Sequence, residues 1–82
     1  MSAHPAKRFW KAAAVIPDGG RFALALDGRR VRTPGGLPLA VPSEALAGAI
    51  ADEWNAVVDK IDPSAMPMTG LANAAIERIA AN

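Results

Sequence analysis

The hydrophobic pattern of the chain changes its period at Pro42, and this change limits the folds that the sequence can adopt. Before Pro42, short apolar runs are separated by Asp-Gly and Gly-Gly steps, which favour tight turns because glycine adopts positive φ at little cost. After Pro42, apolar residues recur at every third or fourth position, as they do along one face of a helix. The sequence therefore predicts an α+β fold in which strands precede helices.

Four short runs in the first half are predicted to form antiparallel strands: residues 11–17, 21–26, 29–34 and 37–42. Phe22, Leu24 and Leu26 alternate with smaller or charged residues, so they share one face of a strand. The first run also has helix propensity, but it is short and ends at Pro17, so a strand is favoured. Pro38 has no amide donor, which puts the last strand at a sheet edge. We predict a β-meander of about four strands.

A long amphipathic helix is predicted to follow, from Ser43 to the residues just before Pro63. Ser43 suits an N-cap, and Glu44 brings a negative charge to the first turn, where it complements the helix dipole. The apolar stripe of this helix consists of Leu46, Ile50, Trp54, Val57, Val58 and Ile61. We expect the stripe to cover the apolar face of the sheet in a two-layer domain, and the Trp54 indole N–H to need a hydrogen-bond partner if it is buried.

The stretch "IDPSAMPMTGLAN" joins that helix to a short second helix, which is predicted to begin at Thr69. Pro63 and Pro67 lower the entropy lost in fixing this corner, so we expect the corner to set the angle between two parts of the chain. The two predicted parts are a β-rich domain with its packing helix and a connector with the start of a truncated helical domain, residues 1–62 and 63–82.

Candidate partner-binding residues fall into two groups. Met66 and Met68 flank a proline, and either they fill a gap beneath the corner, which is the commoner use of methionine, or they contact a partner protein. Arg30 and Arg32 share one face of a predicted strand and offer a basic surface to a phosphate backbone. A small nucleic-acid-binding module that uses the Arg29–Arg32 strand is therefore the alternative function, although a solvated strand explains the cluster equally well.

Composition excludes most enzyme chemistry. His4 is the only histidine and cysteine is absent, so two-histidine metal sites, thiolate sites and histidine-relayed nucleophiles are excluded. Asp52, Glu53 and Asp59 alternate with the apolar stripe, as residues on a solvated helix face do. The net charge of +1 provides no general attraction to nucleic acid or to an anionic membrane. We predict a soluble, intracellular, non-enzymatic protein without metal or cofactor.

Four segments in order carry a family resemblance: "RFWKAAAV" at 8–15, "LDGRRVRTP" at 26–34, "LAVPSEALAGAIADEW" at 39–54 and "MPMTGLANAAIER" at 66–78. Together they closely resemble the assembly chaperones of F-type ATP synthase that bind its α subunit. The resemblance covers almost the whole chain from Arg8 onward.

The resemblance implies an N-terminal, β-rich part of a longer two-domain chaperone, of whose helical domain only the start is present. The implied function is to bind and shield the unassembled α subunit, without catalysis, nucleic acid or membrane insertion. The implied location is the bacterial cytoplasm, or the mitochondrial matrix if the source is eukaryotic. The motif residues that suit a scaffold are Asp27, Gly28, Thr33, Pro34, Pro42, Ser43, Trp54, Pro67 and Thr69.

Overall fold

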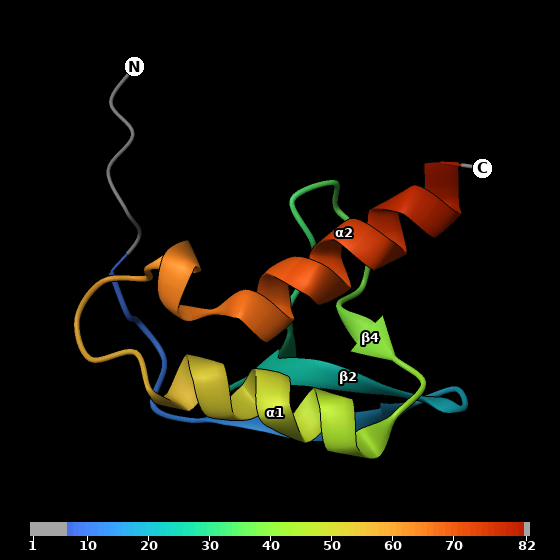
Figure 1. The fold of residues 1–82 in the computed structure, drawn as a ribbon. Helices are drawn as coiled ribbons and strands as arrows, with labels where there is room; N and C mark the ends of the chain where they lie inside the picture. The colour runs from blue at the N-terminus through green and yellow to red at the C-terminus, as the bar shows by residue number, and fades with distance from the viewer. Residues whose placement is uncertain (1–6, 82) are drawn as a thin grey trace.

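The structure, a computed structural model, describes residues 7–81, and within that range it contains a sheet of four antiparallel strands and two α-helices (Figure 1). The strands are β1 (Ala13–Asp18), β2 (Arg21–Leu26), β3 (Arg29–Arg30) and β4 (Ala40–Val41). The helical elements are α1 (Glu44–Asn55), the 3-10 turn η1 (Pro63–Ala65) and α2 (Pro67–Ala81). The predicted α+β fold class is confirmed.

β2 is the central strand of the sheet. β1 pairs along its full length, β3 pairs with its C-terminal end, and β4 pairs with its N-terminal end. In a simple meander β4 would pair with β3. It returns to β2 because the chain between β3 and β4 closes its own turn, in which the Thr33 N–H donates to the Leu37 carbonyl at 2.7 Å. After this turn, the Leu39 carbonyl accepts the Leu24 N–H at 3.0 Å, which places the chain beside β2 just before β4 begins.

The turn predicted at Asp27-Gly28 joins β2 to β3, and both residues have positive φ, 51° and 84°. The Asp27 carboxylate accepts the backbone N–H groups of Ala12 and Lys11 at 3.0 Å. These two hydrogen bonds favour the ionised carboxylate and so hold the pKa of Asp27 below its ordinary value of 3.8, with the bond from Ala12 having the larger effect. The turn therefore also fastens the segment that precedes β1.

The core lies between α1 and one face of the sheet. Its most deeply buried large side chains, Leu24, Leu39 and Ile50, are each 1% exposed. Trp10, just before β1, is 3% exposed, and its ring lies 5.2 Å from that of Trp54. The two-layer arrangement matches the expectation that α1 covers the apolar face of the sheet.

α1 is shorter than predicted, because it ends at Asn55 rather than near the proline of the connector. The Arg8 guanidinium donates to the carbonyls of Val57 at 2.6 Å and Asn55 at 3.2 Å. These carbonyls would accept backbone N–H groups if the helix continued. The Asn55 side chain exchanges two hydrogen bonds with the backbone of Ala13 in β1, at 2.8 and 3.0 Å. Val58, predicted on the apolar stripe, consequently lies beyond the helix and is 92% exposed.

α2 spans 15 residues against 12 for α1, so the prediction of a long first helix and a short second one is wrong. α2 begins at Pro67, two residues earlier than expected. A proline loses no hydrogen bond at the first helical position, where the N–H has no partner within the helix. The N–H groups of Met68 and Thr69 find their acceptor in the Glu53 carboxylate of α1.

Candidate partner-binding surfaces

Four residues fix α1 to the start of α2, and we call them the helix joint: Glu53, Trp54, Met68 and Thr69. The Glu53 carboxylate accepts the Met68 N–H at 2.7 Å and both the N–H and the hydroxyl of Thr69 at 2.8 Å. Thr69 Oγ1 accepts the Trp54 indole N–H at 3.1 Å, so the predicted partner of that indole exists. All four bonds are part-buried and therefore set the relative placement of the helices more firmly than solvent-exposed bonds would.

The connector before α2 is itself capped. Asp62 Oδ1 accepts the N–H and the hydroxyl of Ser64 at 3.1 and 2.7 Å, which begins η1. Met66 then enters the core with 3% of its surface exposed. This position agrees with the gap-filling interpretation of Met66.

A pocket of about 300 Å³ opens beside the helix joint, between the turn that precedes β4 and the first turns of α2. We call it the joint pocket, and its lining includes Arg32, Leu39, Trp54, Met66, Thr69 and Asn73. Asn73 Oδ1 is buried and has no hydrogen-bond partner among residues 7–81. The pocket thus combines an apolar interior with one cationic side chain, that of Arg32.

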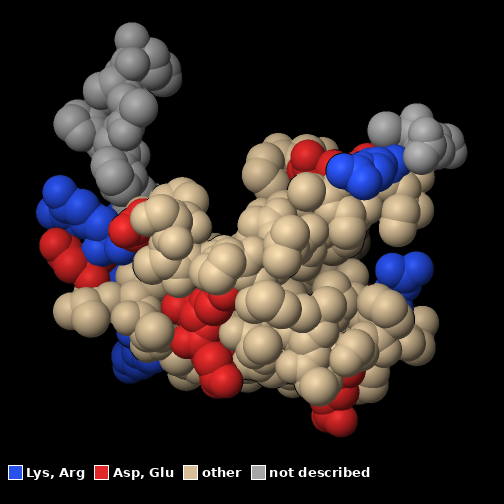
Figure 2. Space-filling model, in the orientation of Figure 1, with Lys and Arg blue, Asp and Glu red and all other residues tan. Residues whose placement is uncertain are grey.

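A second surface runs along the other side of α2, where two cavities of about 290 and 320 Å³ adjoin. Both are lined by Arg21, Ala40, Ile76 and Ile79, and we call this continuous surface the α2 groove. Leu71 and Ile79 border it with 67% and 73% of their surface exposed. Figure 2 shows the hollow beneath the C-terminal end of α2, with uncharged atoms over most of the surrounding face. The groove is therefore an open, largely apolar surface.

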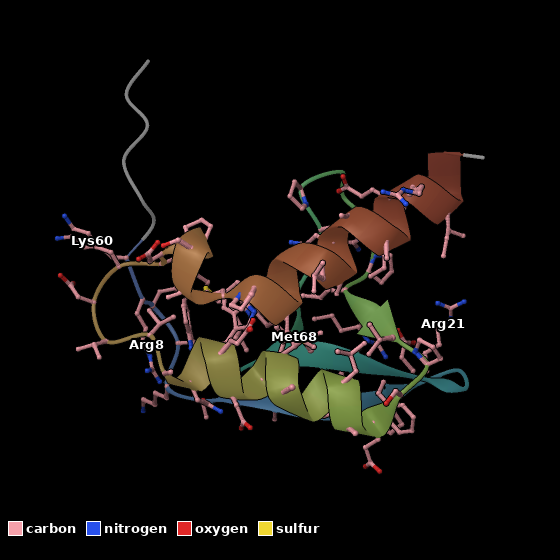
Figure 3. All side chains as sticks on the ribbon, viewed as in Figure 1. Arg8, Arg21, Lys60 and Met68 are labelled. Carbon is pink, nitrogen blue, oxygen red and sulfur yellow. The ribbon has the colours of Figure 1, made fainter. Side chains whose placement is uncertain are left out.

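The predicted partner-binding residues are distributed between these surfaces. Met68 is half-buried in the α2 groove, whereas Met66 and Arg32 line the joint pocket. Figure 3 shows Met68 directed from α2 toward the sheet, and Arg21 near the open end of the groove. The remaining predicted residue, Arg30, lines neither surface and instead forms an ion pair with Asp18 at 3.6 Å.

The arginine strand is shorter than predicted. β3 contains only Arg29 and Arg30, and Arg32 lies outside it in an isolated bridge to Pro38. The Arg32 guanidinium donates to the Gly36 carbonyl at 3.0 Å. One ion-paired and one turn-bonded arginine form a weaker phosphate-binding surface than two free arginines on one strand face.

Two important residues were not recognised in the sequence. Arg8 lies against Trp10, with its guanidinium carbon 5.4 Å from the ring centroid, and bonds the end of α1. Glu53, expected on a solvated face like its exposed neighbour Asp52, is half-buried in the helix joint. The available signal for Glu53 was indirect: Pro67 and Met68 open a helix with no capping side chain of their own, so the first amides need an acceptor from elsewhere.

Residues 7–81 contain no group of three or more His, Cys, Asp or Glu side chains placed to hold a metal ion. In the same range, neither helix has the length and apolar character needed to cross a membrane. His4 lies outside the described residues.

Comparisons with known proteins agree with this geometry. The family model for the ATP12 chaperone protein matches residues 7–82. The mitochondrial protein atp12 of Schizosaccharomyces pombe is 35% identical over 74 residues, which are 87% of this chain and 25% of that protein. The crystal structure of Atp12 from Paracoccus denitrificans matches with a TM-score of 0.86 and 53% identity, over 92% of this chain and 32% of that one.

A protein of Agrobacterium tumefaciens is also similar, with a TM-score of 0.86 and 42% identity over 93% of this chain and 29% of its own. The chain thus spans between a quarter and a third of the length of these relatives. Because the family model covers nearly every residue, the chain belongs to the ATP12 chaperone family.

Proposed function

We propose that this chain is the β-rich part of an assembly chaperone for ATP synthase and that it binds and shields the unassembled α subunit. ATP12 is a chaperone family that acts in assembly of the F1 part of ATP synthase, and it is not an enzyme family. The observation that carries the proposal is the family match over residues 7–82. The proposed occupant of the α2 groove is an apolar surface of that subunit.

The chemistry of the groove supports this assignment. Leu71 and Ile79 leave most of their apolar surface in water, where it contributes nothing to the stability of this chain. An unassembled subunit exposes the apolar surface that it later buries against its neighbour, and such surfaces aggregate. Covering one apolar surface with another removes both from water and needs no nucleotide hydrolysis.

We also propose that residues 63–82 begin a second domain and that the helix joint sets its angle. The bonds from Glu53 to Met68 and Thr69 fix the direction in which α2 leaves the sheet, which is the role proposed for the joint. For the location, we propose the cytoplasm in a bacterium and the mitochondrial matrix in a eukaryote. The mitochondrial relative in Schizosaccharomyces pombe supports the second.

Light scattering tests the function directly. Denatured α subunit is diluted into buffer with and without this chain, and the increase in scattering is recorded. We expect this chain to suppress scattering of the α subunit and to leave scattering of an unrelated aggregating protein unchanged. Unchanged scattering of the α subunit, with the chain shown to be folded by circular dichroism, would contradict the proposal.

A further inference from the structure

The outer edge of β1 is the longest strand edge in the part of the chain that the structure describes. Within residues 7–81, β1 has six residues and pairs with β2 alone, whereas the other outer strands, β3 and β4, have two residues each. An unpaired strand edge presents backbone N–H and C=O groups to which a strand of another chain can add. Protection of this edge therefore has to come from particular residues.

The pairing register shows which residues of β1 direct their backbone groups outward. Residues on an antiparallel strand alternate between pairs that exchange backbone hydrogen bonds and pairs that do not. Val15 lies opposite Leu24, whose own N–H and C=O bond to the segment between β3 and β4 instead. The backbone groups of Val15 therefore point away from β2, and by the same alternation so do those of Ala13 and Pro17.

Two of these three outward positions are already protected, one fully and one in part. The Asn55 side chain, at the end of α1, accepts the Ala13 N–H at 2.8 Å and donates to the Ala13 carbonyl at 3.0 Å, as a neighbouring strand would. Pro17 has no N–H, so its place on an outward position costs the sheet no hydrogen bond. Among residues 7–81, Val15 alone in β1 keeps both an outward N–H and an outward C=O without a partner.

Charge gives this edge little protection. Natural sheet edges are often protected by lysine or other charged side chains, which oppose the approach of a second strand. Residues 13–17 of β1 are all uncharged, and Asp18, at the end of the strand, is held in its ion pair with Arg30. Asn55 is therefore the main group that closes the first half of this edge.

We propose that the Asn55 amide closes the edge of β1 against a second copy of the chain. Without the amide, two β1 strands pair antiparallel with Val15 opposite Val15. Each Val15 then exchanges backbone hydrogen bonds with the other, and each Ala13 N–H donates to the Pro17 carbonyl of the second copy. With the amide in place, Ala13 is occupied and only the bonds of Val15 remain. The inference concerns the chain by itself and goes beyond the proposed function.

Three variants test the proposal by sedimentation equilibrium over a range of protein concentrations. Asn55→Ala frees the backbone groups of Ala13, and Asn55 is exposed, so this variant should fold. Trp54→Phe is the control for lost stability, because it removes a part-buried hydrogen bond at the helix joint and none at β1. Asn55→Ala/Val15→Pro also removes the Val15 N–H, at an outward position equivalent to that of Pro17.

We expect Asn55→Ala to dimerise with a dissociation constant at least about tenfold below that of the wild type, because both Ala13 N–H groups of the dimer gain an acceptor. Trp54→Phe should associate no more than the wild type does. The double variant should return to the monomer. It also loses an apolar side chain that packs against the core, so association caused by instability would increase in it instead.

Hydrogen exchange in the dilute wild type gives a test that does not depend on the folding of any variant. Exchange followed by NMR should be slow at the Ala13 amide, which is bonded to Asn55, and fast at the Val15 amide, which points outward. In Asn55→Ala, the Val15 amide should become protected at high concentration and exchange rapidly again on dilution.

Four results would overturn the inference. Slow exchange at Val15 in the dilute wild type would show that the edge is already closed at that residue. A folded Asn55→Ala that stays monomeric would show that the amide does not control access to the edge. Equal association of Asn55→Ala and Trp54→Phe would assign the dimer to lost stability, and association of the double variant would assign it to another surface.

Discussion

The two ends of α2 are held in different ways. At its start, the Glu53 carboxylate accepts three donors from Met68 and Thr69, and the Trp54 indole adds a fourth bond. Near its end, a hydrogen bond from the Gly35 N–H to Glu77 ties the helix to the turn before β4, while Ile79 remains 73% exposed beside the α2 groove. Four part-buried bonds thus fix the start of the helix, whereas its other end has one exposed bond and presents apolar surface.

This difference separates stability from binding. Substitutions at the helix joint are expected to lower the free energy of unfolding, because they leave buried polar groups without partners. Substitutions of the exposed groove residues Leu71 and Ile79 are expected to change binding with little effect on folding, because those two side chains are already in water. The predictions below begin with the largest expected loss of stability.

Trp54→Arg should have the largest effect. It removes a ring that packs 5.2 Å from Trp10 and places a charge between the helices, so we expect a loss of about 3–5 kcal/mol, enough to unfold most of the chain. Trp54→Phe keeps the ring and removes only the indole hydrogen bond, at a cost of about 1 kcal/mol. Thermal melts followed by circular dichroism measure both, and an unchanged melting curve for Trp54→Arg would contradict the account.

Glu53→Ala should come next, with a loss of about 2–3 kcal/mol, because the first amides of α2 and the Thr69 hydroxyl lose their acceptor. Its neighbour Asp52 is exposed, so Asp52→Ala is the matched control and should change stability by less than about 0.5 kcal/mol. Urea titration should show a lower midpoint with an unchanged slope for Glu53→Ala only. Equal midpoints for the two variants would show that the joint is not a source of stability.

Arg8→Met should have a smaller effect, about 1–2 kcal/mol, because carbonyls near the end of α1 lose a charged donor while the apolar stem is kept. Arg29→Met, at an exposed position on β3, serves as the control. Hydrogen exchange should show faster exchange in the last turn of α1 for Arg8→Met. The same exchange rates in both variants would refute the role of Arg8 in ending the helix.

The pH dependence from Asp27 should be the smallest effect, because this carboxylate is on the surface. Its pKa is lowered on folding, so its stabilising contribution is complete above the unfolded value of 3.8 and is lost as the pH falls through the lower folded value. Asp27→Asn should therefore lower the urea midpoint at neutral pH, and the difference from the wild type should shrink below pH 3.8. A difference that stays constant into acid would exclude the ionised carboxylate as the cause.

Local patterns predicted local structure well. The Asp27-Gly28 turn and the Ser43 cap of α1 were predicted from the sequence and confirmed, since Ser43 Oγ accepts the Leu46 N–H at 3.2 Å. The β2 strand was predicted from the alternation of Phe22 with two leucines, which depends only on the geometry of a single strand. Each of these features is determined within a few residues.

The helix boundaries that depend on distant partners were not predicted. The end of α1 depends on a bond from Arg8 to the Val57 carbonyl, 49 positions later in the sequence. The start of α2 depends on a bond from the Met68 N–H to Glu53, 15 positions earlier. The hydrophobic period of a helix does not reveal these contacts, because the apolar pattern continues past the residue at which tertiary hydrogen bonds end the helix. The joint pocket was missed for the same reason, since three separate segments line it.

The most direct test of the account is a calorimetric titration of the α subunit with two folded double variants. Leu71→Glu/Ile79→Glu places two charges on the α2 groove, and Phe9→Glu/Val58→Glu places the same charges on exposed apolar residues elsewhere, 77% and 92% exposed. We predict that the groove variant binds at least about tenfold more weakly than the wild type, as loss of an interface centre does, while the control variant keeps its affinity. Equal affinity of the groove variant and the wild type would contradict the claim that the open side of α2 binds the client.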